Sequence, residues 1–375
     1  MLFSAVPGLL TLKTQLIKGV QANHIAHAQL FVGRPGTANL PLAIAYANYL
    51  NCENRGEEDA CGNCPSCLKN AKYIHPDFHF SFPVAANEDV KADQAKISNN
   101  FLKYWRSFLI ADPFQSVENW VDHIGVGNKQ LNISRDESRQ IIKNLSLKAF
   151  EGKYKIMLIW LPEFLHSSAA NALLKIIEEP ADRTVFLLVS NNHEKLLGTI
   201  TSRTQSVFVP AYSDEEVKQY LVDKHDVALN KAAQLAHIAQ GDLHKAISLK
   251  DDLADDTQKE FESWMRECYT ADYGQLVRRS EQFHKWSKIN QQQWFIHAGG
   301  IIREALIAGI QADELMRIPA AHKGFVQKFS KTVSLEKAAE MSTLLSESAY
   351  YLERNASPKM TFMNISIEFM KVFKK

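Results

Sequence analysis

Short apolar runs alternate with helical patterns over roughly the first 210 residues of the chain. Four of the runs are typical of buried strands: 28–32, 155–161, 185–189 and 206–209. A fifth run, 78–82, alternates apolar and polar residues, as a half-buried strand does. Helical patterns occupy three segments between the runs: 40–50, 134–147 and 167–179. The second of them opens with Ser-Arg-Asp-Glu at 134–137, the pattern of a capping box. Strands separated by helices in this way predict a parallel α/β sheet.

After about residue 210 the strand patterns end and helical periodicity continues to the last residue. The stretch 213–216, Ser-Asp-Glu-Glu, has the pattern of a capping box that opens a helix. A small helical region, 211–252, ends in the charged run 250–252, and a larger helical region follows at 253–375. The sequence therefore predicts an α/β domain followed by two all-α domains.

Residues from about 84 to 130 form a segment that fits neither pattern well. It begins with polar residues and then carries four large aromatic side chains: Trp105, Phe108, Phe114 and Trp120. Aromatic residues at such spacing fill a core more often than they stack on nucleic-acid bases, although a stacking platform remains the alternative. We predict a helical insertion with a buried aromatic stripe.

The overall composition is that of a globular protein with a near-neutral surface. Of the 375 residues, 46% are hydrophobic and 23% charged, and the formal net charge is +1. The length favours two or three domains. The small net charge provides no strong overall field for nucleic acid or anionic lipid. No apolar stretch approaches the roughly 20 residues of a membrane span, and the first residues lack the pattern of a signal peptide, so a cytoplasmic location is expected.

Four of the five cysteines are clustered in a metal-binding pattern. Cys52, Cys61, Cys64 and Cys67 have the spacing C-x8-C-x2-C-x2-C, and turn-forming residues separate the last three. Four thiolates suffice for one closed tetrahedral Zn²⁺ site, which would be structural rather than catalytic. An iron–sulfur cluster is the alternative, but such runs carry a further cysteine three residues on, where this chain has Ala71. Unliganded thiols are the third possibility. Cys268 lies in a helical pattern and is expected to be buried.

The loop after the first strand has the frame of a phosphate-binding loop without its functional residues. A P-loop reads G-x-x-x-x-G-K-[ST], in which the lysine meets phosphates and the hydroxyl binds Mg²⁺. This chain reads Gly33-Arg34-Pro35-Gly36-Thr37-Ala38-Asn39-Leu40. Asn39 carries no charge and Leu40 cannot bind a metal ion. The loop is therefore a degenerate P-loop or, on its own, a chance Gly-Pro-Gly turn.

The second half of an ATPase site is missing independently. Such a site needs acidic residues at the end of a neighbouring strand, where they hold Mg²⁺ and polarise the attacking water. The strand at 155–161 instead ends in Trp160 and Leu161, and Glu163 follows only after a proline. Loss of both elements from a retained apolar framework indicates an inherited ATPase fold without hydrolysis.

Four stretches carry a family resemblance: His27–Phe31, Asn171–Lys175 with Glu178–Pro180, Thr201–Gln205 and, more weakly, Arg354–Lys359. Together they resemble the bacterial DNA polymerase III clamp-loader subunits, which are AAA+ proteins. The degenerate loop is most similar to the delta-prime class of these subunits. The resemblance covers roughly residues 5–250 and leaves the aromatic insertion unmatched.

The resemblance implies a three-part chain. Residues 1–210 would form an AAA+ base with a zinc module at 52–67 and the insertion at about 84–130, residues 211–252 a helical lid, and residues 253–375 a helical collar for oligomerisation. In the family, such subunits assemble into an open ring in which motor subunits (tau/gamma) use ATP, together with delta, to place a sliding clamp on primer-template DNA during replication. The delta-prime class acts there as a non-hydrolysing stator.

The resemblance also implies roles for single residues. Arg203 matches an arginine that delta-prime supplies in trans to the ATP site of a neighbouring motor subunit, with Thr204 replacing the usual cysteine. The alternative is an ordinary arginine on an exposed loop. His244 stands where active subunits carry a nucleotide-sensing lid arginine, and Asn191 or Asn192 matches a polar sensor, unless it is an ordinary loop asparagine.

Two other functions remain open from the sequence alone. One is a catalytically active motor (tau/gamma-type) clamp-loader ATPase with a divergent P-loop, which the missing lysine, hydroxyl and acidic pair disfavour. The other is a zinc-containing nucleic-acid binder, which the near-neutral charge disfavours. ATP turnover by the isolated chain would support the first, and tight DNA binding at physiological salt the second.

Overall fold

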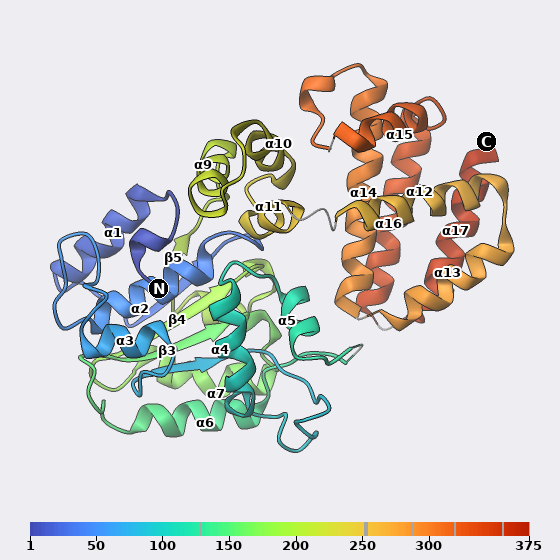
Figure 1. Cartoon of the computed structure of the whole chain (residues 1–375). Coiled ribbons are helices and arrows are strands. Elements are labelled where there is room, and N and C mark those ends of the chain that lie inside the picture. The colour runs from blue at the N-terminus through green and yellow to red at the C-terminus, as the bar shows by residue number, and fades with distance from the viewer. Residues whose placement is uncertain (128, 251–253, 287, 319, 355, 375) are drawn as a thin grey trace. The chain divides into compact units, whose positions relative to one another are not determined.

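The computed structural model describes residues 1–127, 129–250, 254–286, 288–318, 320–354 and 356–374. The chain forms two compact units (Figure 1). The first comprises Met1–Val126, Gln130–Lys224 and Gln240–His244; the second comprises Gly127–Lys129, His225–Ala239 and Lys245–Lys375. The predicted border between residues 252 and 253 lies outside the described residues, and the division into three domains remains a prediction.

The first unit is built on a five-stranded parallel sheet, which confirms the predicted α/β class. Its strands are β1 (Ala28–Val32), β2 (Phe78–Ser81), β3 (Lys155–Trp160), β4 (Thr184–Ser190) and β5 (Gln205–Phe208). They lie in the order β2-β3-β4-β1-β5. The two strands that flank β4, namely β3 and β1, end level with its last residues: Trp160 pairs with Val189 and Val32 with Ser190. The loops that follow these strands therefore meet at one edge of the sheet.

Helices cover both faces of this sheet (Figure 1). Successive strand residues point to opposite faces, so each strand contributes side chains to both layers of packing. On one face Phe31 contacts the ring of Tyr46 from α2 (Asn39–Asn51), a helix that is buried along its whole length. On the other face Leu30 belongs to an apolar cluster with side chains from α6 (Arg135–Ser146) and α7 (Ser167–Glu178).

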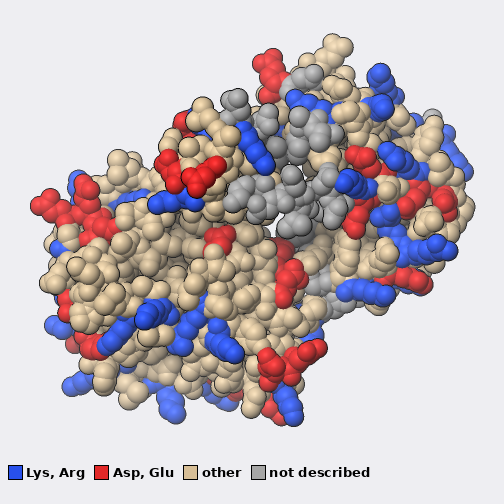
Figure 2. Space-filling model, in the orientation of Figure 1, with Lys and Arg blue, Asp and Glu red and all other residues tan. Residues whose placement is uncertain are grey.

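The remaining helices of the first unit lie around this core: α1 (Leu10–Gln21), α3 (Pro65–Ala71), α4 (Leu102–Ala111), α5 (Val117–His123), α8 (Gly198–Thr201) and α9 (Asp214–His225). Short 3₁₀ helices occur at Phe3–Ala5 (η1), Ser98–Phe101 (η2), Pro162–Phe164 (η3) and His193–Lys195 (η4). On the face drawn in Figure 2, basic and acidic side chains are interspersed.

The two expected helix starts differ in detail. The capping box before α9 forms, since Glu216 accepts the backbone N–H of Ser213 at 2.8 Å and donates its own N–H to the Ser213 hydroxyl at 3.2 Å. Before α6, Ser134 caps the helix by accepting N–H groups of the first turn. Glu137 does not complete that box; its buried carboxylate instead binds the N–H and the hydroxyl of Ser98, both at 2.7 Å.

The insertion is helical, and its aromatic side chains are core residues, as predicted. Trp105, Phe108 and Trp120 are fully buried. The ring of Trp105 lies 4.3 Å from that of Phe82, which follows β2, and 5.1 Å from that of Trp160 at the end of β3. The indole of Trp120 also donates to the carbonyl of Pro83 at 2.8 Å. The insertion thus extends the core of the first unit beyond the end of β3.

The second unit is helical in its described residues. Its elements are α10 (Leu229–Ala239), most of α11 (Leu243–Lys250), α12 (Ala254–Thr270), α13 (Tyr273–Lys285), α14 (Lys288–Gly309), η5 (Asp313–Leu315), α15 (Ala320–Ser330), α16 (Leu335–Glu353) and α17 (Pro358–Lys374). Trp264 is central to its core, with ring contacts to Phe362 and Phe369. Cys268 is 1% exposed in the same core, so its predicted burial is confirmed. None of the described helices is both long enough and apolar enough to cross a membrane.

Candidate functional site

The loop after β1 joins this strand to α2 through a tight turn. Gly33 donates its N–H to the carbonyl of Ser190 at 3.2 Å, which fixes the loop to the end of β4. The hydroxyl of Thr37 donates to the carbonyl of Arg34 at 2.8 Å. Gly36 has φ +74°, a left-handed conformation that glycine adopts without strain. The predicted succession of strand, turn and helix is therefore formed, while the assignment as a degenerate P-loop stays a prediction.

The side chain of Asn39, at the position of the P-loop lysine, is turned into the protein. Its Nδ2 lies 3.2 Å from the carbonyl of Ser190 and 2.8 Å from Oδ1 of Asn191, and its Oδ1 accepts the N–H of Leu40 at 3.0 Å. The residue is only 4% exposed. An uncharged amide whose hydrogen bonds are already made inside the fold offers little to a phosphate. Leu40, which is 2% exposed, places an apolar side chain where Mg²⁺ needs an oxygen ligand.

The end of β3 is apolar, and the nearby acid is engaged elsewhere. Trp160 and Leu161 are both buried. Glu163, in η3, accepts the N–H of Asn191 at 3.0 Å, and burial raises the pKa of its carboxyl group. Asn39, Asn191 and Glu163 therefore form one hydrogen-bonded chain across the loops that follow β1, β4 and β3. The partners within this chain of hydrogen bonds were not apparent from the sequence.

A carboxylate lies against the turn of the loop. A Cβ atom placed on Gly36 would collide with the carboxylate of Asp242, and the N–H of Leu243 donates to the carbonyl of Gly36 at 2.9 Å. The side chain of Asp242 therefore occupies the space beside the turn. Sequence reasoning missed Asp242, because only folding brings it to the loop.

Arg203 lies just after α8, near the protein surface. Its Nε donates to Oε2 of Glu178 at 2.8 Å, and one terminal nitrogen donates to the carbonyl of Thr199 at 3.1 Å. The two ionic side chains are 32% and 55% exposed, respectively. Ion pairs as exposed as this one contribute at most about 1 kcal/mol, so a phosphate group can compete for the guanidinium. The two predicted sensor residues have other partners: His244 binds Asp112, and the N–H of Asn192 donates to the hydroxyl of Ser190.

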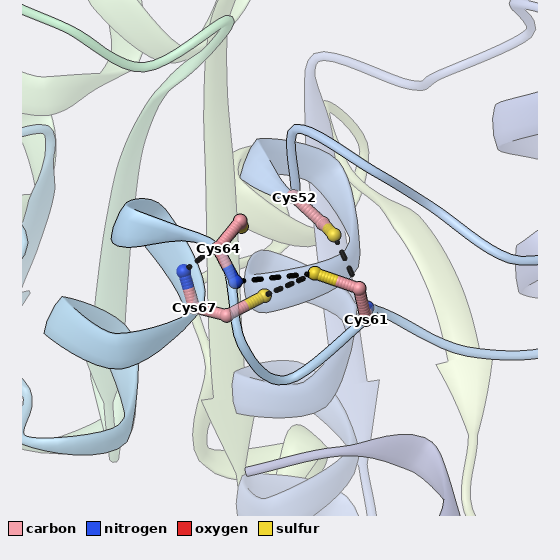
Figure 3. A group of neighbouring side chains, drawn as sticks. All are labelled: Cys52, Cys61, Cys64 and Cys67. Atoms are coloured by element: carbon pink, nitrogen blue, oxygen red, sulfur yellow. Dashed lines mark hydrogen bonds between the residues drawn. The ribbon is translucent and has the colours of Figure 1, made fainter.

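The four cysteines predicted to bind metal converge (Figure 3). All four sulfur atoms lie within 4.8 Å of one another. A tetrahedral zinc ion with bonds of about 2.3 Å requires sulfur atoms about 3.8 Å apart, close to this spread. Backbone N–H groups point at three of the sulfurs: Cys61 donates to Cys52 at 3.2 Å, Cys64 to Cys61 at 3.3 Å and Cys67 to Cys64 at 3.4 Å. The cluster could therefore hold a metal ion.

The protonation of the thiols differs with their surroundings. Hydrogen bonds from the N–H groups of Asn63 and Cys64 lower the pKa of Cys61 to about 6. Burial raises the pKa of Cys52 and of Cys67. Metal binding requires thiolates, and a cation held among the sulfurs supplies the positive charge that buried thiolates need. The donor set fits a thiolate-bound ion.

Comparison with known proteins identifies related sequences. The chain matches the family described as DNA polymerase III, delta subunit, over residues 10–212, more than half of its length. It is 29% identical to DNA polymerase III subunit delta' of Pseudomonas aeruginosa over 222 residues, which are 58% of this chain and 54% of that protein. It is 31% identical to subunit delta' of Yersinia pestis over 179 residues, 47% of this chain and 39% of the other.

A second kind of relative matches over a longer stretch. The chain is 26% identical to DNA polymerase III subunit tau/gamma of Haemophilus influenzae over 257 residues, 66% of this chain and 30% of that protein. Across these three relatives, the chain spans between 30% and 54% of their lengths. The sequence comparison alone thus leaves both types of subunit as relatives.

Proposed function

The chain belongs to the family of clamp-loader proteins described as DNA polymerase III, delta subunit, and from this premise we propose that it is a clamp-loader subunit that does not itself hydrolyse ATP. The observation that carries the proposal is the side chain of Asn39, whose amide is bound to Ser190 and Asn191 inside the fold. The apolar end of β3 and the carboxylate of Asp242 against Gly36 support it.

In this role the chain works in the cytoplasm as the delta-prime-like stator of a ring. Its partners are motor subunits of the tau/gamma type and a delta subunit, and through the assembled complex a sliding clamp and primer-template DNA. The helices of residues 253–375 serve as the collar that joins the ring. Similarity to delta' proteins of two bacteria supports this assignment.

Arg203 is the residue through which the chain contributes to catalysis, as an arginine finger inserted into the ATP site of an adjacent motor subunit. A planar guanidinium that is always charged can stabilise the charge that develops on the transferred phosphoryl group. The exposed and weak pairing of Arg203 with Glu178 supports this role, because the side chain can change partners at small cost.

Cys52, Cys61, Cys64 and Cys67 hold a structural Zn²⁺ ion. When bound, zinc supplies a fixed tetrahedral cross-link and no redox or hydrolytic chemistry in a site with four protein ligands. The chain's own part is to aim the sulfurs: α2 ends at Asn51 just before Cys52, and Cys64 caps the start of α3 with its sulfur. The ion would then join these two helices through the irregular segment between them.

The full-length chain, purified alone, is expected to release no phosphate from ATP and Mg²⁺ above the rate in buffer. Asn39→Lys should not restore turnover, because Trp160 and Leu161 still supply no carboxylate at the end of β3. Phosphate release at saturating ATP checks this result. Steady turnover that Asn39→Ala abolishes would instead identify a motor-type ATPase with a divergent loop.

A further inference from the structure

The aromatic insertion, which has no counterpart in the family resemblance, contacts the segment of residues 240–244 directly. Oδ2 of Asp112, the residue after α4, lies 2.7 Å from Nδ1 of His244. The two side chains are only 19% and 22% exposed. The other oxygen of Asp112 accepts the N–H of Phe114 at 2.8 Å, which orients the carboxylate toward the histidine. The carboxylate is therefore fixed both by the backbone of the insertion and by His244.

The same segment is fixed on its other side to the degenerate loop. The N–H of Leu243 donates to the carbonyl of Gly36 at 2.9 Å. Gly241 has φ +82°, and a Cβ atom there would collide with the carbonyl of Tyr212. Residues 240–244 are thus held between the turn at Gly36 and the carboxylate of Asp112, all within the first unit.

Aromatic contacts connect the insertion to the elements around the segment. The ring of Phe114, which is 3% exposed, lies 6.4 Å from that of Tyr212 and 6.1 Å from that of Tyr220 in α9. A second aromatic residue of the insertion, Trp105, packs on Trp160 at the end of β3. The insertion therefore contacts both the end of β3, where an ATPase would carry acidic residues, and α9, the first helix after the sheet.

A bound nucleoside triphosphate joins a phosphate loop to more distant segments because its phosphates attract cationic and N–H groups from both. In this chain Asp112 presents a carboxylate, a protein anion, to His244. We propose that the insertion replaces bound nucleotide as the link. The Asp112–His244 contact, together with the packing of Phe114 on Tyr212, whose N–H donates to the carbonyl of Gly241 at 3.4 Å, holds residues 240–244 against the loop at 33–38 in one arrangement without ATP. The proposal rests on the proposed function only in treating that loop as a former nucleotide site.

Hydrogen–deuterium exchange on the full-length chain tests the proposal. Asp112→Ala should speed exchange in peptides covering residues 240–244 by about tenfold or more, because a hydrogen bond to a charged group and the fixed position of the segment are lost together. His244→Ala should have a similar effect, and the double variant should exceed neither single variant by much, since both remove one contact. Asp93→Ala is the matched control, because that insertion carboxylate is 99% exposed.

The outcomes separate this proposal from the proposed function. Unchanged exchange at 240–244 in a folded Asp112→Ala protein, or fully additive effects in the double variant, would overturn the link. If Asp112→Ala does not fold, His244→Ala alone decides the matter. Protection of residues 240–244 in the wild-type chain by ATP and Mg²⁺ would also overturn it, since nucleotide would then form the contact. A failed link leaves the role of Arg203 intact, because that role is measured by the ATP turnover of partner subunits.

Discussion

Replacing Arg203 by alanine is expected to lower ATP turnover at the adjacent motor site by about 10³-fold or more, while this chain folds and assembles as before. The change removes the guanidinium that would offset transition-state charge, and it disturbs only a partly exposed ion pair with Glu178. The measurement is phosphate release by reconstituted complexes of tau/gamma-type and delta subunits with the wild-type or variant chain. The part of the turnover that depends on adding the wild-type chain should disappear.

Three further variants make the Arg203 result specific. Arg203→Lys keeps the charge without the planar fork, so most of the loss should persist. Glu178→Ala frees the guanidinium and should retain full stimulation. Arg139→Ala removes another exposed arginine paired with a carboxylate, Asp136, and should have no effect. Full turnover with Arg203→Ala in an intact complex would leave this arginine as an ordinary surface residue.

Local patterns in the sequence predicted the framework of the first unit well. The run at 155–161 indicated a buried parallel strand because it is apolar on both faces, and β3 is indeed buried along its whole length. Close spacing of Cys61, Cys64 and Cys67 also constrains the backbone strongly, so their convergence with Cys52 followed from the sequence. Both features depend on residues that are near one another in the chain.

Contacts between distant residues could not be predicted in the same way. Asn39 and Asn191 are 152 residues apart, and Asp112 and His244 are 132 apart. The family pattern gave positions for three of these four residues but no partners, and for Asp112 it gave nothing. Glu137 shows the same limit on a smaller scale. The local pattern predicted that its carboxylate would complete a capping box, but the carboxylate instead accepts the N–H and the hydroxyl of Ser98. Both Ser98 groups are buried, and leaving them unpaired would cost free energy.

The proposed absence of ATP hydrolysis is supported by several of these distant contacts together. Asn39 is bound to the β4 loop, the side chain of Asp242 lies against Gly36, and Trp105 of the insertion packs on Trp160. Each contact opposes ATP hydrolysis for a different reason: the first leaves no cation for a phosphate, the second places a side chain beside the turn, and the third keeps the end of β3 apolar. Restoring one residue would therefore leave the other two obstacles in place.

Changing Cys64 to serine is expected to remove the bound metal and to loosen residues 50–75 of an otherwise folded chain. Three remaining thiolates cannot complete a closed tetrahedral site, and the ion contributes directly to local folding. Serine keeps an oxygen that can cap α3 by accepting the N–H of Cys67, as the sulfur of Cys64 does now. Loss of order in this region would therefore report the metal rather than the helix cap.

Metal analysis and limited proteolysis together measure the effect of Cys64→Ser. The wild-type chain should carry about one zinc ion and resist cleavage between residues 50 and 75, whereas the variant should carry almost none and be cleaved there about tenfold faster or more. Cys268→Ala is the matched control, because that cysteine is buried in the second unit, outside the cluster, and its loss should leave the zinc in place. A chelator should reproduce the Cys64→Ser pattern in the wild-type chain. A coloured wild-type protein that contains iron would contradict the zinc assignment, and an equally ordered metal-free variant would contradict the structural role.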